Sequence, residues 1–168
     1  PLLEETAEFS SEATTLILLA FGLSAFVGNL IVGKFADAHA VAVLRLGHAL
    51  LFVSLAALAF TAHIQPAVLV LVLVVGFTGV TMNPPLVTRV VEVGGSGNLV
   101  STIHTSIITL GITIGTAVSA TTMSAFGNNP AVAMWTGSGF ALLAALVLAL
   151  QTLRTRRVKA LRPPLEVG

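Results

Sequence analysis

Long apolar stretches separated by short polar connections form the dominant pattern of this chain. The five stretches cover residues 13–33, 41–62, 66–88, 99–126 and 131–153. Each has at least the about 20 residues that an α-helix needs to cross a hydrocarbon layer about 30 Å thick. Stretches such as 68–75 and 141–150 do not show the apolar–polar alternation of barrel strands. The pattern predicts an all-α, polytopic membrane protein with five transmembrane helices.

The composition agrees with a chain that lies mostly in lipid. It is 55% hydrophobic and 9% charged, whereas soluble domains carry roughly 25% charged residues. The 168 residues leave room for five crossings and short loops but not for a sizeable soluble domain. The absence of cysteine excludes disulfides, thiolate metal sites and cysteine nucleophiles. We expect the lipid bilayer as the main surroundings, and no cofactor, metal site or nucleic-acid partner.

All eight positive charges fall on one side of the predicted helices. The first connection carries Lys34, with Arg45 just inside the second stretch, and the third connection carries Arg89. The remainder follow the fifth stretch, in a tail of residues 154–168. The second and fourth connections carry no Lys or Arg. Because Lys and Arg in short loops mark the cytoplasmic side, we expect a multi-pass protein of the cell inner (plasma) membrane. Its N-terminus would lie outside, with the basic tail in the cytoplasm.

The five stretches also differ in kind, in an order that repeats every three. The first and fourth are rich in glycine, the second and fifth are mostly Leu, Ala, Val and Phe, and the third is interrupted at 83–85. Three-helix units of alternating orientation are the inverted repeats of secondary transporters. The odd helix count and the absence of a Met at position 1 predict that residues 1–168 form an incomplete C-terminal transmembrane domain.

The fourth stretch is the most polar of the five. At about 100° per residue, one stripe carries five hydroxyl side chains: Thr102, Ser106, Thr109, Thr113 and Thr116. Gly111 and Gly115 lie on the opposite face, as a pair that lets another helix approach closely. We therefore expect this helix near the centre of the bundle, with Thr109 and Thr113 on a solute path. The alternative is that each hydroxyl bonds the carbonyl four residues earlier in its own helix.

His104 and Asn83 are further candidates for the solute path. His104 is a histidine inside a polar crossing, and ionisable residues there are functional candidates that titrate in the range a proton-coupled carrier needs. The alternative is a neutral ring bonded to a neighbouring helix. Asn83 precedes two prolines that remove backbone donors and break or kink the helix. Its amide could satisfy a freed carbonyl or face a solute, unless the helix simply ends at Pro84.

Two residues of the first stretch and one of the connection after it have predicted roles in packing and gating. Gly28 is expected to pack against another helix. Gly33 permits a tight turn after the helix, and Asp37 is placed to cap the next helix or to face its N-terminus. We therefore expect Gly33 and Asp37 in a cytoplasmic gate loop between the first two helices.

Several segments together resemble the major facilitator superfamily, in its drug/proton antiporter and sugar-efflux branch. Residues 18–37 (LLAFGLSAFVGNLIVGKFAD) are similar to the family's eighth helix, running into a degenerate copy of its G-x-L-A-D loop. Residues 84–89 (PPLVTR) resemble the end of the tenth helix and 99–115 (LVSTIHTSIITLGITIG) the eleventh, with His104 and Thr109 where relatives often have asparagines. The two residues after the loop Asp, where relatives are basic, are Ala38 and His39.

The resemblance implies a secondary transporter rather than an enzyme. It implies efflux of a small organic solute, such as a drug or a sugar, by alternating access, and coupling to protons. The missing N-terminal half of the transporter would then be a further partner. The alternatives are a polytopic membrane enzyme, which would need clustered acid, base or metal-binding groups that this sequence lacks, and a membrane subunit that does not transport.

Overall fold

The computed structural model describes residues 2–161, and the side chains of these residues except Asp37, Val80 and 155–161. It confirms the all-α prediction, with five helical segments long and apolar enough to cross a membrane: Ser11–Ala36, Ala38–Phe60, Gln65–Gly94, Asn98–Ala125 and Pro130–Arg154. The predicted residues 162–168 of the tail lie outside the described part.

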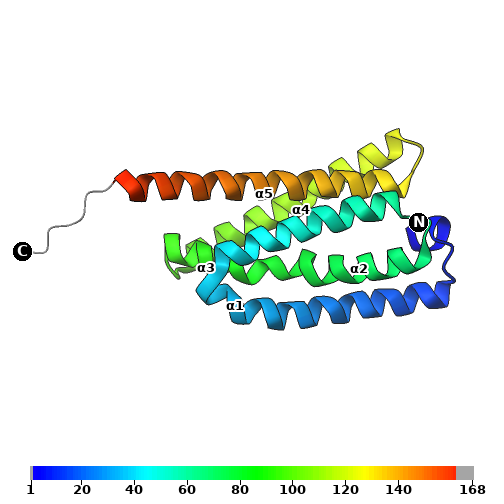
Figure 1. Cartoon of the computed structure of the whole chain (residues 1–168), viewed down its shortest axis with the longest axis horizontal. Helices are drawn as coiled ribbons and strands as arrows, with labels where there is room; N and C mark the ends of the chain where they lie inside the picture. The colour runs from blue at the N-terminus through cyan, green and yellow to red at the C-terminus, as the bar shows by residue number, and fades with distance from the viewer. Residues whose placement is uncertain (1, 162–168) are drawn as a thin grey trace, which may run out of the picture.

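The first two spans form one kinked helix, α1 (Ser11–Phe60). The Ser10 side chain caps its start by accepting from the Ala13 N–H (3.2 Å). The backbone leaves helical geometry only at His39 (φ −137°, ψ 32°). The prediction of a loop with a turn at Gly33 is therefore wrong, because Gly33 lies inside the helix and the bend comes six residues later. From the kink the second limb turns back along the bundle, and α2 runs between the two limbs in Figure 1.

The third span is broken, as predicted, but it does not end at Pro84. Helix α2 (Gln65–Gly79) passes through a short 3-10 turn, η2 (Val80–Met82), into α3 (Asn83–Gly94). Prolines 84 and 85 stand in the first turn of α3, where a missing N–H costs nothing and the fixed φ suits the helix. Gly95 ends α3 with a positive φ of 80°, and its N–H donates to the Val91 carbonyl (2.9 Å).

The last two helices, α4 (Asn98–Ala125) and α5 (Pro130–Leu161), form a hairpin. Gly127 and Asn128 both have positive φ in the turn, and the Asn129 Oδ1 accepts from the Ala131 N–H (2.9 Å) at the start of α5. Connections alternate between the two ends of the bundle. The start of α1, the α1–α2 turn and the α4–α5 turn lie at one end, and the α1 kink, the α3–α4 turn and the end of α5 at the other (Figure 1).

The core lies around α1, which packs mainly against α2, α5 and α3. Near the N-terminal end, Ala7, Leu58 and Val68 form a buried cluster. The amide of Gln65 donates to the Ala7 carbonyl (3.0 Å) and so holds the segment that follows η1 (Leu2–Thr6) against the bundle. The buried Ser138 of α5 donates to the Phe52 carbonyl of α1 (3.2 Å).

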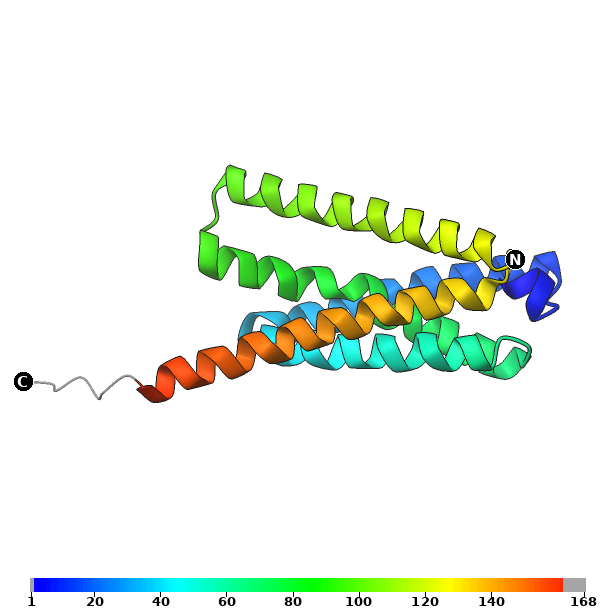
Figure 2. The same cartoon turned by 90° about the horizontal axis from the view of Figure 1, so that it is seen from above.

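Helix α4 lies at the edge of the bundle in the described structure, not at its centre. None of its residues is buried, and its main contacts are with α5 and α3. Figure 2 shows α4 close to α5 at their shared turn and diverging from it toward the α3–α4 turn. The expectation of a central position is wrong for the described residues. The polar face of a helix suits a position inside a bundle, but it does not show which neighbouring helix covers that face.

Candidate functional site

A cleft between α3 and α4 brings together two of the four predicted solute-path residues, Asn83 and His104. Its volume is about 660 Å³, within the range of small-molecule sites. Asn83 reaches it from the first turn of α3, immediately after η2, and His104 from the second turn of α4. Apolar side chains such as Leu86, Val90 and Ile108 form most of the remaining wall. The helix break at η2 therefore delivers an amide to a largely apolar cleft.

The other two predicted residues, Thr109 and Thr113, face a separate shallow groove of about 400 Å³ on the outside of α4. Both are exposed. Thr109 donates to the Thr105 carbonyl (3.0 Å) and Thr113 to the Thr109 carbonyl (2.9 Å). The hydroxyls thus make the bonds to their own helix that were considered as the alternative. These bonds do not prevent the two hydroxyls from contacting a solute. Each carbonyl also accepts an N–H of its own helix, and a hydroxyl can turn away from it at a cost of about 1 kcal/mol.

His104 is the one predicted site residue with an unsatisfied buried atom. Its Nε2 is buried and has no hydrogen-bond partner among the described residues. The alternative, a ring bonded to a neighbouring helix, is therefore not met at Nε2. His48 differs, because its Nδ1 lies 2.7 Å from the Leu44 carbonyl of its own helix. A carbonyl only accepts, so the Nδ1 of His48 carries the proton.

A second cavity of about 680 Å³ lies on the other side of His104, between α1, α3, α4 and α5. Arg89, His48 and His104 contribute its basic groups, from three different helices. From the sequence, Arg89 indicated only the orientation of the chain, and His48 was not a candidate. The available signal was the amphipathic character of 86–93, which places Arg89 and Glu92 among mostly apolar residues.

Gly28 lies where α1 crosses α2. A Cβ there would stand 2.6 Å from both the Phe77 carbonyl oxygen and the Thr81 Cγ2. Gly76 makes the reciprocal approach, since its Cβ would stand 2.9 Å from the Phe21 carbonyl oxygen. Ser24, one turn before Gly28, donates to the Leu73 carbonyl (2.8 Å). Ser24 was not among the candidates, although its four-residue spacing from Gly28 is typical of close helix contacts.

Gly111 and Gly115 face open space in the described structure, with no atom within 4 Å of a built Cβ. Their role in helix packing therefore stays a prediction. The backbone of Asp37 belongs to α1, but its side chain lies outside the described part. Its role in a gate also stays a prediction.

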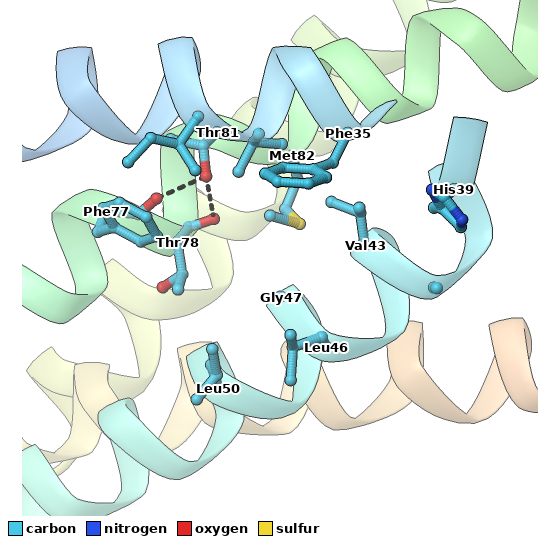
Figure 3. Close-up of a pocket in the computed structure, with 13 residues that line it drawn as sticks. Phe35, His39, Val43, Leu46, Gly47, Leu50, Phe77, Thr78, Thr81 and Met82 are labelled. Carbon is cyan, nitrogen blue, oxygen red and sulfur yellow. Dashed lines mark hydrogen bonds between the residues drawn. The ribbon is translucent and has the colours of Figure 1, made fainter. Parts of the chain in front are cut away.

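An apolar pocket of about 310 Å³ occupies the inside of the α1 kink, beside the segment that was expected to form the gate (Figure 3). Phe35, His39 and Met82 line it. The hydroxyl of Thr81 also faces it but donates to the Phe77 carbonyl (2.5 Å) of its own helix. Since the lining offers few free polar groups, this pocket provides space for the bend rather than recognition of a polar solute.

A family model supplies the relationship that the geometry alone leaves open. The model described as Major Facilitator Superfamily matches residues 1–167, which is nearly the whole chain. The comparisons with curated proteins and with solved structures found no match. Members of this superfamily are secondary transporters of small molecules, not enzymes. The five spans, the broken third span and the family match agree, and the chain belongs to the major facilitator superfamily.

Proposed function

We propose that this chain forms part of an efflux permease that moves a small organic solute by alternating access. The observation that carries the proposal is the α3–α4 cleft, where Asn83 and His104, with the hydroxyl residues Ser101 and Thr105, line a largely apolar space. A few polar groups in an apolar cleft are typical of small-molecule sites. In this proposal Asn83 and His104 contact the solute, and Thr109 and Thr113 extend the path along the exposed face of α4.

The proposal includes the assembly and the orientation of the chain. The five spans would be the last five of twelve helices, and the open face of α4 with Gly111 and Gly115 would pack against the N-terminal half. The end that carries the α3–α4 turn would face the cytoplasm of a bacterial inner membrane, since the Lys and Arg residues gather there. Gly33 and Asp37 would move with the α1 kink as part of a cytoplasmic gate.

Coupling to protons is a further part of the proposal. It is supported by the resemblance to drug/proton antiporters and by the buried, unpaired Nε2 of His104, because a histidine can exchange a proton near neutral pH. No other titratable side chain of the described residues lines the α3–α4 cleft.

A flux assay tests the proposal. The natural protein that contains this sequence is reconstituted into liposomes, and the movement of a panel of labelled drugs and sugars is followed with and without an imposed pH gradient. We expect at least one solute to move faster than in protein-free liposomes, and the gradient to increase its rate. If no solute moves in either condition, although the protein is folded, the transport proposal is wrong.

A further inference from the structure

Arg89 places a charged guanidinium within the third span. Arg89 lies on α3, five residues before Gly94 and so about 7 Å from the end of the third span. Its side chain is half-buried, and no hydrogen bond or ion pair joins it to another described residue. Glu92, one turn further along α3, is exposed and does not pair with it. Because a charge inside a span is costly without a partner, an anion is expected beside Arg89.

Arg89 opens into two adjoining spaces, and neither contains a carboxylate among its described lining residues. One is the cavity of about 680 Å³ between α1, α3, α4 and α5. The other, of about 100 Å³, lies between Arg89, Val41 and the last part of α5. Leu148 and Gln151 line both spaces. An anion that enters here therefore meets no like charge from the described walls.

The groups opposite Arg89 also suit an anion. His104 lines the larger cavity from α4, and its Nε2 is covered by surrounding atoms and has no hydrogen-bond partner among the described residues. A buried polar atom without a partner is rare in folded proteins and requires an explanation, of which a bound water or ion is one. A guanidinium offers a planar set of N–H donors that matches a carboxylate or phosphate. An imidazole N–H from the facing helix would add a donor from the other side.

The rest of the wall is apolar, with side chains such as Leu86, Ile107 and Val147. A free inorganic anion would gain nothing from these groups, whereas an organic acid with an apolar body would bury that body against them. The cavity volume lies in the range of solute-sized sites. We propose that the cavity between α1, α3, α4 and α5 binds an organic anion, with its acid group at Arg89 and His104. This assignment rests on the proposed transport function in that the bound anion is the transported solute.

Charge-selective labelling tests the site without knowledge of the natural solute. The chain has no cysteine of its own, so Leu148→Cys places a single thiol of this chain on the wall shared by both spaces. Leu150→Cys, on exposed α5 surface outside the cavity, is the matched control. The natural protein in phosphatidylcholine vesicles is treated with an anionic or a cationic methanethiosulfonate reagent, and both labelling rates are measured.

We expect Arg89→Gln to lower the ratio of anionic to cationic labelling rates at Leu148→Cys at least threefold, and Arg89→Lys to preserve it. Arg45→Gln, which removes an exposed charge outside the cavity, should leave the ratio unchanged. With Arg89 intact, naphthalene-2-carboxylate should slow the labelling of Leu148→Cys but not of Leu150→Cys, and the neutral naphthalene-2-carboxamide should slow neither. If Arg89→Gln does not fold, the labelling-rate ratio of Arg89→Lys and the protection by the two naphthalene compounds still test the assignment.

Three results would overturn the assignment. One is a rate ratio that does not depend on Arg89, and another is equal protection by the carboxylate and the carboxamide. The third is slowed labelling when phosphatidylglycerol alone is added to the vesicles, which would give the site to a lipid headgroup. Charge-selective protection without any solute flux would contradict the transport proposal alone. Solute flux without such protection would contradict the anion site alone.

Discussion

Gly28 of α1 and Phe77 of α2 approach so closely that a Cβ on Gly28 would stand 2.6 Å from the Phe77 carbonyl oxygen. Gly76, next to Phe77 on α2, makes the reciprocal contact with Phe21, seven residues before Gly28 on α1, with 2.9 Å between the built Cβ and the carbonyl oxygen. Two backbone approaches of this kind fix α2 against the first limb of α1. Lipid gives helices little hydrophobic reason to associate, so close packing of small residues stabilises this pair.

The Gly28→Ala substitution should therefore destabilise the protein. The added methyl meets backbone as well as the Thr81 side chain, and overpacking of this kind costs about 1–3 kcal/mol. Gly22→Ala is the matched control, since no atom lies within 4 Å of its built Cβ and alanine favours the helix by up to about 1 kcal/mol. Thermal unfolding in detergent measures both. Equal midpoints for the two variants would contradict the close contact.

A milder effect is expected at Gly47, where a Cβ would overlap the Sδ and Cε of Met82. Because a flexible thioether can move, Gly47→Ala should cost less than Gly28→Ala. Shortening Met82 should remove most of that cost, so the Gly47→Ala and Met82→Ala pair should show a coupling of about 1 kcal/mol in a double-mutant cycle. Strictly additive unfolding energies would show that the two side chains do not meet.

The hydroxyls of α4 allow stability and transport to be separated. Thr109 and Thr113 bond only their own helix and are exposed, so their replacement by Val should change the free energy of unfolding little. If each hydroxyl contacts solute, its loss should lower the flux by about fivefold, which corresponds to about 1 kcal/mol. Thr121→Val removes a similar i−4 bond outside the groove and should leave the flux unchanged. Normal flux in both Thr109→Val and Thr113→Val would show that neither hydroxyl lies on the solute path.

The orientation can be tested with single cysteines at the two ends of the bundle. Ser96 lies in the α3–α4 turn and His63 in the α1–α2 turn, and both are exposed. We expect a membrane-impermeant thiol reagent added outside intact cells to label His63→Cys and not Ser96→Cys. Everted vesicles should reverse this result. The opposite pattern would invert the proposed topology, and labelling of both from one side would contradict the spans.

The sequence predicted the five spans because span length and apolar character are properties of a segment by itself. It also located the break in the third span, since prolines 84 and 85 remove two backbone donors wherever they stand. It did not predict that α3 continues for a further ten residues to Gly94, because prolines in a first turn are compatible with a new helix. The bend at His39 instead of Gly33 was missed for a related reason: a glycine permits a turn but does not require one.

The candidate site was predicted only in part. Asn83 and His104 were recognised from their chemistry, but their meeting in one cleft depends on how α3 and α4 turn back at Gly95. Arg89 was understood as a signal of orientation, since a basic residue near the end of a span usually faces water. Its position on a cavity shared with His48 and His104 depends on the packing of four helices, which no local pattern in the sequence expresses.

The initial rate of solute flux in liposomes that contain the natural protein, with Asn83 intact or replaced by leucine, tests the transport proposal most directly. Asn83→Leu removes the amide from the α3–α4 cleft and keeps a side chain of similar size, and Ile114→Leu on exposed α4 surface outside the cleft is the control. We expect clear flux for the unmodified protein and for the control, and a loss of about fivefold or more for Asn83→Leu. Flux that is no faster than in protein-free liposomes, or equally fast in all three proteins, would contradict transport through this cleft.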